Sequence, residues 1–186
     1  MNKDGLAIRY KTEEMNKLFQ TNVIGTMTMT RTVLPYMIKQ KKGSIVTIGS
    51  IVGEGGRIGQ SIYSASKSAL IGYSRSLAKE MGRYHIRSNL IEPGFINTQM
   101  TEQLLDKDPS LLQRIALGRI GTCEEVANAV RFLLSEEASY ITGSVFMILI
   151  IVINRFYMLM VVYRFSLRLF ETNKQIKAII IRYKTK

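Results

Sequence analysis

The distribution of hydrophobic residues predicts short buried strands in the first three quarters of the chain. The apolar run Ser44–Ile48 is rich in β-branched residues and has a glycine on each side. A second such run covers Ile86–Ile91 and ends in Glu-Pro-Gly, and Val145–Ile151 has the composition of a last strand. Continuous apolar runs of this length, bounded by turn residues, are typical of strands that are buried on both faces.

Longer stretches between these runs have the spacing of amphipathic helices. Apolar residues recur at helical spacing from Thr12 onward, and we expect this helix to kink or restart at Pro35 before it ends near Lys39–Lys42. The segment Tyr63–Met81 lacks proline and has one glycine, which also predicts a helix. Strands that alternate with helices indicate an α/β fold.

The remaining segments are predicted from capping and turn residues. Thr122 and Glu125 have the spacing of a capping box at the start of a helix. The expected core side of that helix is Val126, Val130, Phe132, Leu133 and Leu134. The glycine-rich segment 53–59 is interpreted as a flexible loop, and residues 97–118 as a mobile helical lid that Pro109 interrupts.

Composition narrows the possible functions. The 186 residues are 46% hydrophobic and fit one domain, and the net charge is +12. Eight Lys or Arg and one acidic residue lie in 145–186, so the positive charge is concentrated in the tail. Residues 1–144 are mildly basic, which suits a phosphate-bearing cofactor or acyl carrier and does not indicate nucleic-acid binding. One cysteine, Cys123, and one histidine, His85, exclude an internal disulfide and a Cys/His metal site.

Three polar side chains are expected to meet at the end of the first strand. Ser50 follows that strand, while Tyr63 and Lys67 are four positions apart on one helix face. An ammonium group near a phenol lowers the phenol pKa toward the range useful for acid–base catalysis, and a hydroxyl can hydrogen-bond a carbonyl oxygen as it gains charge. The alternative is that Tyr63 is a tyrosine at the core edge and Lys67 a solvated charge.

The spacing of these residues resembles the active site of the short-chain dehydrogenase/reductase family. Tyr63 follows Ser50 by thirteen positions, and Lys67 follows Tyr63 by four. The text GSIVTIGSIVGEGGRIGQSIYSASKSALIGYSRSLAKE is similar to the β-ketoacyl-acyl-carrier-protein reductase branch, as are IRSNLIEPGFINTQM and RIGTCEEVANAVRFLLSEEASYITG. The resemblance covers about residues 2–144. It implies a Rossmann-type doubly wound parallel sheet, of which this chain contains the C-terminal half.

The resemblance implies a role for each catalytic residue. Tyr63 would protonate the carbonyl oxygen, Ser50 would hold the substrate carbonyl, and Lys67 would lower the pKa of Tyr63. Asn22 lies in the segment Thr-Asn-Val-x-Gly, whose asparagine holds a water in a proton relay to the lysine in the family. A purely structural role for Asn22 is the alternative.

The same resemblance implies an NADP(H) site. Tyr63 and Lys67 would contact the cofactor, with the lysine on the nicotinamide ribose. Pro93 and Gly94 would let the backbone approach the nicotinamide. Ile96 would contact its carboxamide, and Thr98 would lie near the cofactor phosphates. The preference for NADPH over NADH comes from the branch alone.

The implied activity is the NADPH-dependent reduction of a 3-oxoacyl thioester or related carbonyl in fatty-acid biosynthesis. The resemblance further implies a homo- or hetero-tetramer and a mitochondrial matrix location, with the cytoplasm as the alternative. No Gly-x-Gly-x-x-Gly turn follows a strand in this sequence. We therefore expect the first half of the family domain to be missing, and a non-catalytic fragment that oligomerises with a full-length reductase is the alternative function.

Residues 145–186 are expected to form a divergent hydrophobic and basic tail. This segment contains no glycine or proline, whereas all fourteen glycines and three prolines precede it. Its composition resembles read-through into non-coding sequence. Residues 145–163 approach the length of a membrane helix, but Arg155 makes insertion costly, so membrane contact is possible and not favoured.

Overall fold

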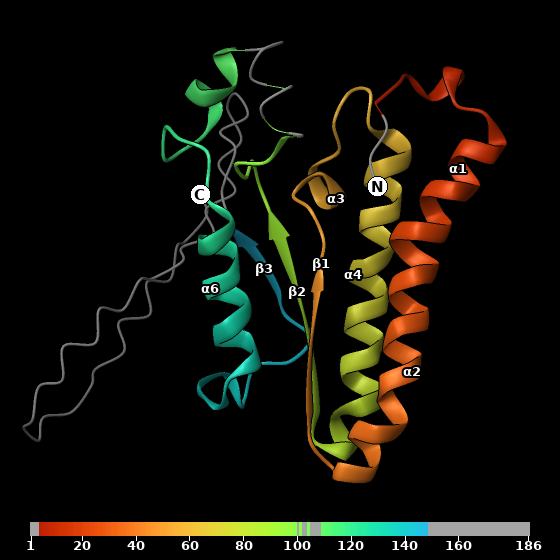
Figure 1. Cartoon of the computed structure of the whole chain (residues 1–186), viewed down its shortest axis with the longest axis vertical. Helices are drawn as coiled ribbons and strands as arrows, with labels where there is room; N and C mark the ends of the chain where they lie inside the picture. The colour runs from red at the N-terminus through yellow and green to blue at the C-terminus, as the bar shows by residue number, and fades with distance from the viewer. Residues whose placement is uncertain (1–3, 100, 102–103, 105–108, 149–186) are drawn as a thin grey trace, which may run out of the picture. The chain divides into compact units, whose positions relative to one another are not determined.

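The structure is a computed structural model, in which residues 4–99, 101, 104 and 109–148 are described. Every described residue belongs to one compact unit, which lies within Met1–Phe156 (Figure 1).

The centre of the first unit is a parallel sheet with the strand order β1-β2-β3. The strands are β1 (Gly43–Ile48), β2 (Ile86–Pro93) and β3 (Val145–Ile148). The first two confirm the strands predicted from the apolar runs, each slightly longer than expected. The third begins where it was predicted, and residues 149–151 of that prediction lie outside the described part of the chain.

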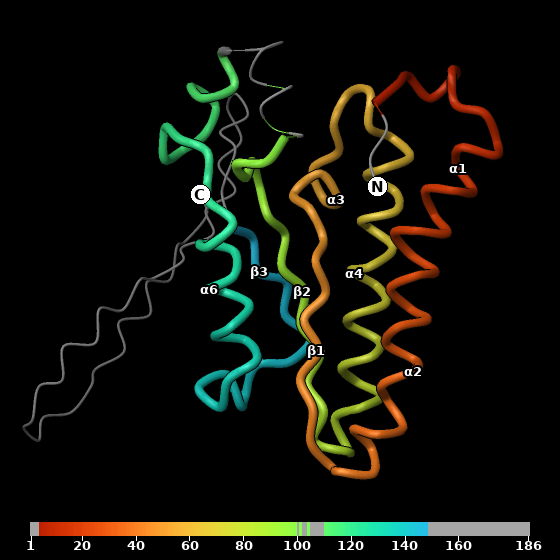
Figure 2. The backbone as a smooth tube through the Cα atoms, in the orientation of Figure 1, coloured from red at the N-terminus to blue at the C-terminus, as the bar shows by residue number. Residues whose placement is uncertain are grey.

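Helices cover both faces of the sheet, which confirms the doubly wound α/β class (Figures 1 and 2). Helix α4 (Ser61–Met81) packs on one face and α6 (Cys123–Leu134) on the other. Adjacent residues of β2 explain this arrangement, because successive side chains of a strand point to opposite faces. Leu90 packs against α4 and Ile91 against α6, and neither is exposed to solvent.

The predicted N-terminal helix is continuous but not uniformly α-helical. It consists of α1 (Thr12–Phe19), a π-helical segment η2 (Gln20–Ile24) and α2 (Gly25–Gln40). The helix continues through Pro35 to Gln40, so it does not restart there, and a kink at Pro35 stays a prediction. Pro35 lies at an exposed position, where water can hydrogen-bond the carbonyl that loses its partner.

The predicted capping box of α6 is confirmed, but its predicted core side is only partly correct. The Glu125 N–H donates to Thr122 Oγ1 at 3.2 Å, and the Thr122 N–H donates to the Glu125 carboxylate at 2.8 Å. Leu133 is buried, whereas Phe132 and Leu134 are 38% and 49% exposed. Three consecutive helical residues are spread over a wide arc, so they cannot all face the sheet.

Two segments predicted as loop or lid contain regular structure. The short helix α3 (Val52–Gly55) occupies part of the predicted flexible loop. Pro109 begins the 3-10 helix η4 (Pro109–Arg114), and the residues directly before it, 105–108, lie outside the described part of the chain. The rest of the predicted lid lies partly outside the described residues. The other short 3-10 helices are η1 (Ala7–Arg9), η3 (Gly82–Tyr84) and η5 (Glu136–Ala138).

The predicted tail and membrane helix lie almost entirely in residues 149–186, outside the described part. Within the described part, no helix has the length and apolar character needed to span a bilayer.

A carboxyl group is buried inside this fold. Glu92 of β2 is completely inaccessible to solvent, and neither carboxyl oxygen has a hydrogen-bond partner among the described residues. Burial and the nearby Glu54 raise the pKa of Glu92 to about 7, while Arg75 acts in the opposite direction. Burial penalises the charged form of an acid, so Glu92 holds its proton to near neutral pH.

This burial predicts that the fold loses stability as the pH rises. The pKa of Glu92 is about 7 in the fold and about 4.5 in the unfolded chain, so the folded state binds the proton more tightly. The free energy of unfolding should therefore fall between pH 4.5 and 7, by on the order of 3 kcal/mol, since each pKa unit corresponds to about 1.4 kcal/mol. Denaturant unfolding measured across this range checks the prediction.

Glu92→Gln provides the comparison, because it keeps the shape of the side chain without the charge. The difference in unfolding free energy between this variant and the wild type should grow in the variant's favour as the pH rises. Glu54→Gln should move the transition to lower pH, because it removes one cause of the raised pKa. A difference that stays constant with pH would contradict the assignment.

Candidate active site

Ser50 lies immediately after β1, where the pairing with β2 continues for two further hydrogen bonds. The Gly49 N–H donates to the Ile91 carbonyl at 2.7 Å, and the Ile51 N–H donates to the Pro93 carbonyl at 3.2 Å. A Cβ atom at Gly49 would lie 2.8 Å from Leu90 Cδ2, closer than carbon atoms can approach. A glycine is therefore required beside Ser50.

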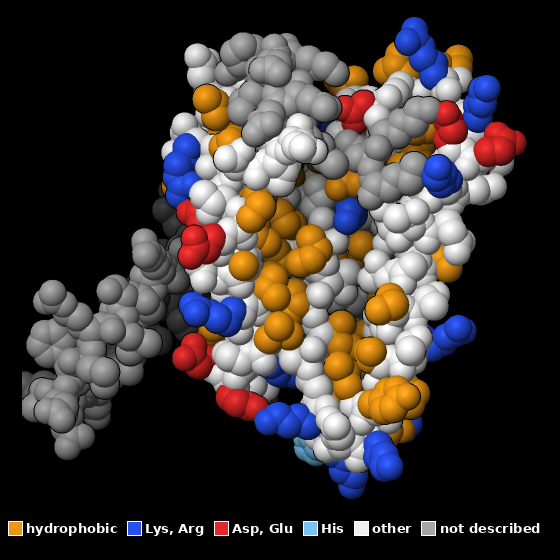
Figure 3. Space-filling view, in the orientation of Figure 1, with side chains coloured by type: hydrophobic (Ala, Val, Ile, Leu, Met, Phe, Trp, Pro, Cys, Tyr) orange, Lys and Arg blue, Asp and Glu red, His pale blue; other side chains and the backbone are white. Residues whose placement is uncertain are grey.

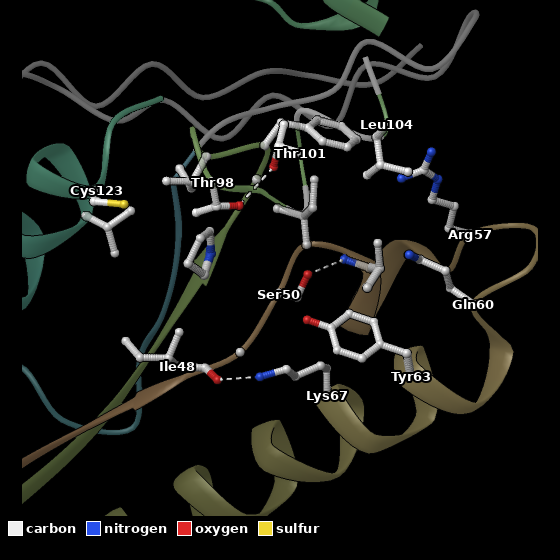
Figure 4. A pocket seen from close by; sticks show the side chains of 18 residues that line it. Ile48, Ser50, Arg57, Gln60, Tyr63, Lys67, Thr98, Thr101, Leu104 and Cys123 are labelled. Carbon is white, nitrogen blue, oxygen red and sulfur yellow. Dashed lines mark hydrogen bonds between the residues drawn. The ribbon is translucent and has the colours of Figure 1, made fainter. Parts of the chain in front are cut away.

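Tyr63 and Lys67 reach the same point from the first turns of α4 (Figure 4). The Lys67 Nζ lies 5.8 Å from the centroid of the Tyr63 ring and donates a hydrogen bond of 3.0 Å to the Ile48 carbonyl. Figure 4 shows the Tyr63 hydroxyl directed toward Ser50. The structure thus brings together the three residues that the sequence predicted to converge.

Burial dominates the electrostatics of this trio. It raises the pKa of Tyr63 above its ordinary value, while the hydrogen bond from Ser50 acts in the opposite direction. Burial also lowers the pKa of Lys67. The predicted net lowering of the Tyr63 pKa by Lys67 is not found in this arrangement, because desolvation of the phenol outweighs the favourable interactions.

A cavity of about 360 Å³ opens beside the trio. Its volume falls in the range of small-molecule sites, and its lining is mainly apolar with a few polar groups. The predicted residues that line it are Ser50, Tyr63, Lys67, Pro93, Gly94, Ile96 and Thr98.

Four of the six residues predicted to bind the cofactor, Pro93, Gly94, Ile96 and Thr98, lie on one continuous segment that begins with the last residue of β2. Gly94 donates its N–H to the Ile148 carbonyl at 3.0 Å, and Ile96 forms a parallel bridge with Gly121. The hydroxyl groups of Thr98 and Thr101 are 3.4 Å apart. These contacts hold the segment against the end of the sheet, with Pro93 and Ile96 offering an apolar surface to the cavity.

The residues present fit the nicotinamide end of a dinucleotide. The Lys67 ammonium can donate to ribose hydroxyls, and the apolar wall formed by Pro93 and Ile96 can face a planar ring. Tyr63 lies across the same cavity.

Asn22 is not part of the cavity lining but contacts α4 through Ser66. Its side chain is buried in the π-helical segment η2, and Nδ2 donates to Ser66 Oγ at 3.1 Å. The Ser66 hydroxyl donates in turn to the Tyr63 carbonyl at 2.7 Å. Asn22 therefore contacts the turn of α4 that carries both Tyr63 and Lys67. Single π-helical turns occur frequently at functional sites.

Several residues at the site were not predicted from the sequence. Ser66 links Asn22 to α4, and Arg57, Gln60 and Phe95 line the cavity. None of them belongs to a short motif with a recognisable spacing. Phe95 and Arg57 come together only because the segment after β2 folds back over the loop after α3.

Comparison with known proteins shows extensive similarity. A family model described as enoyl-(acyl carrier protein) reductase matches residues 1–148. The human 3-oxoacyl-[acyl-carrier-protein] reductase and carbonyl reductase family member 4 of Xenopus laevis are each 50% identical over 148 residues, which is 80% of this chain and 61% of each relative. The FabG reductase of Thermotoga maritima is 46% identical over 144 residues, 77% of this chain and 58% of that protein.

The chain thus spans about three fifths of the length of these relatives. The matched region ends with β3, and it contains Asn22 and all residues of the predicted site. The family match over most of the chain, together with the predicted α/β fold, shows that the chain belongs to the short-chain dehydrogenase/reductase family.

Proposed function

We propose that this chain carries the carbonyl-reducing site of an NADPH-dependent 3-oxoacyl thioester reductase. The observation that carries the proposal is the arrangement of Ser50, Tyr63 and Lys67 around one cavity. The Tyr63 hydroxyl is directed toward Ser50 (Figure 4), and Lys67 lies one helical turn away, with its Nζ 5.8 Å from the centroid of the tyrosine ring. The similarity to 3-oxoacyl-[acyl-carrier-protein] reductases supports the choice of substrate class.

The polar groups divide the chemistry among them. Ser50 hydrogen-bonds the substrate carbonyl oxygen, and Tyr63 donates a proton to that oxygen as it gains negative charge. The raised pKa of Tyr63 keeps its hydroxyl protonated near neutral pH, as a proton donor requires. Lys67, fixed by the Ile48 carbonyl, places its positive charge beside the phenol and stabilises the phenolate that forms.

The cofactor in this proposal is NADPH, which supplies the hydride when bound. Lys67 and Tyr63 hold the nicotinamide ribose. Pro93, Gly94 and Ile96 orient the ring, and Thr98 lies toward the phosphates. We further place the protein in a tetramer of related reductase subunits in the mitochondrial matrix. The resemblance to the reductase branch supports that placement, with the cytoplasm as the alternative location.

A second function is a non-catalytic subunit that assembles with a full-length reductase. The observation that favours it is the outer position of β1 in the described sheet, where Ile48 is 43% exposed. Figure 3 shows hydrophobic side chains gathered on the face that includes α6, β1 and α2. Exposed examples on these elements are Ile48, Phe132, Leu134, Met29 and Val33. Open strand edges and apolar patches of this kind favour association.

The first test is reduction of an acetoacetyl thioester by the purified chain, followed through the oxidation of NADPH. Tyr63→Phe should lower turnover by at least about 100-fold, because it removes the proton donor and leaves the ring in place. Tyr36→Phe is the matched control, since Tyr36 is 71% exposed on α2, and it should leave turnover unchanged.

The outcomes separate the two proposed functions. Turnover that depends on Tyr63 supports the reductase. Lack of turnover by the chain alone, with restored or altered activity when it is assembled with a full-length relative, supports the non-catalytic subunit. Equal turnover by the wild type and Tyr63→Phe would contradict the reductase mechanism.

Asn22 provides a separate test, because it is proposed to relay protons and also holds Ser66. Asn22→Ala should lower turnover about 10-fold or more and change its pH profile. Ser66→Ala removes the same hydrogen bond but leaves the amide in place. The expected result is that Ser66→Ala has the smaller effect. Equal losses in the two variants, with equal losses of stability, would assign Asn22 a structural role only.

A further inference from the structure

The charges that line the cavity have one sign. Among the lining residues of the described structure, Arg57 and Lys67 are the charged ones, and both are cations. The Lys67 ammonium donates a hydrogen bond to the Ile48 carbonyl. Arg57 and Gln60 lie on the side of the cavity opposite Cys123 (Figure 4). The described part of the lining thus holds two cations and no acid, which favours an anionic ligand.

Arg57 is presented by a well-defined turn. The Gln60 N–H donates to the Arg57 carbonyl at 3.0 Å, and the flanking Gly56 and Gly59 have φ angles of 65° and 80°. Such angles are readily adopted by glycine and disfavour other residues.

The start of the chain secures this turn. The Gly5 N–H donates to the Gly59 carbonyl at 2.8 Å, and Gln60 Nε2 donates to Asp4 Oδ1 at 2.8 Å. Gln60 is buried, so the turn is held from both its backbone and its side chains. The position of Arg57 at the cavity is thus set by contacts that do not involve its own guanidinium group.

The guanidinium group itself forms no hydrogen bond with the residues that the structure describes. It lies over the ring of Phe95, 5.5 Å from the ring centroid, and Arg57 is half-buried. A cation at this distance is attracted to the face of an aromatic ring without using its N–H groups. No described side chain forms an ion pair with Arg57. Its planar fork of donors matches the geometry of a carboxylate or phosphate.

The position of Arg57 is on the substrate side of the site. The residues proposed to hold the cofactor lie on the segment that starts at the end of β2 or on α4. Arg57 instead lies six residues before Tyr63, on the loop that leads into α4. Val52 and Leu104, two apolar residues, line the same cavity. A bound carbonyl compound that reaches Ser50 and Tyr63 would have an apolar wall and one cation within the same cavity.

We propose that Arg57 binds an oxyanion group of the substrate and makes the site selective for anionic carbonyl compounds over neutral ones. The oxyanion is a carboxylate of an oxo acid or a phosphate of the arm that carries an acyl thioester. This inference rests on the proposed function for the identity of the reacting carbonyl. Binding selectivity, however, can be measured without hydride transfer.

The test is calorimetric binding of three probes to the full chain, each with and without NADP⁺. Acetoacetate carries a carboxylate, acetoacetyl-coenzyme A carries phosphates, and S-acetoacetyl-N-acetylcysteamine is a neutral thioester. Arg57→Gln should weaken binding of an anionic probe by about 10-fold or more and leave the neutral probe unchanged. Arg57→Lys should weaken it less, because the charge remains while the fork is lost. Arg31→Gln, an exposed change on α2, is the control.

Each outcome decides the proposal. An Arg57-dependent preference for acetoacetate identifies a carboxylate, and one limited to acetoacetyl-coenzyme A identifies the phosphate-bearing arm. Equal loss for the neutral and anionic probes in Arg57→Gln would mean that Arg57 only packs on Phe95, and would overturn the proposal. The proposal would also be overturned if no probe bound to the wild type or to the variants while the thermal unfolding of all of them was the same. Arg57-dependent selective binding of an anionic probe, without NADPH turnover, would support the proposed role of Arg57 and contradict the proposed reductase function.

Discussion

The parallel pairing of β1 with β2 is the constraint on which the site depends. The pairing continues beyond the end of β1, because Gly49 is hydrogen-bonded to Ile91 and Ile51 to Pro93. Ser50 is therefore held between two residues whose backbones are attached to β2. Helix α4 packs on the face of β2 that includes Leu90, so its first turns bring Tyr63 and Lys67 to the same strand ends. Open α/β sheets bind ligands at this edge, where the carboxyl ends of parallel strands meet.

Burial at this edge favours uncharged side chains. It raises the pKa of Tyr63 and Glu92 and lowers that of Lys67. Arginine responds differently, because a guanidinium group keeps its charge in proteins. Arg57 therefore supplies a positive charge in a cavity where burial shifts Tyr63 and Lys67 toward their neutral forms. Its contact with Phe95 compensates part of its desolvation and leaves its hydrogen-bond donors available.

Local sequence signals predicted most of the framework because each rests on neighbouring residues. The capping box at Thr122, the strands and the start of α4 depend on spacing over a few positions, and they were confirmed. Errors arose where an element's surroundings decide the outcome. Phe132 and Leu134 are partly exposed because only part of α6 meets the sheet.

The sequence alone determined the fold class, the alternation of strands and helices, and the set Ser50, Tyr63 and Lys67, because periodicity and motif spacing are local properties of the chain. Only the tertiary structure decided the pKa values of these groups and which other side chains lie next to them. The pKa of Tyr63 depends on its burial, and the Arg57–Phe95 contact joins residues 38 positions apart. Desolvation and long-range packing depend on every neighbouring element, so no short stretch of sequence specifies them.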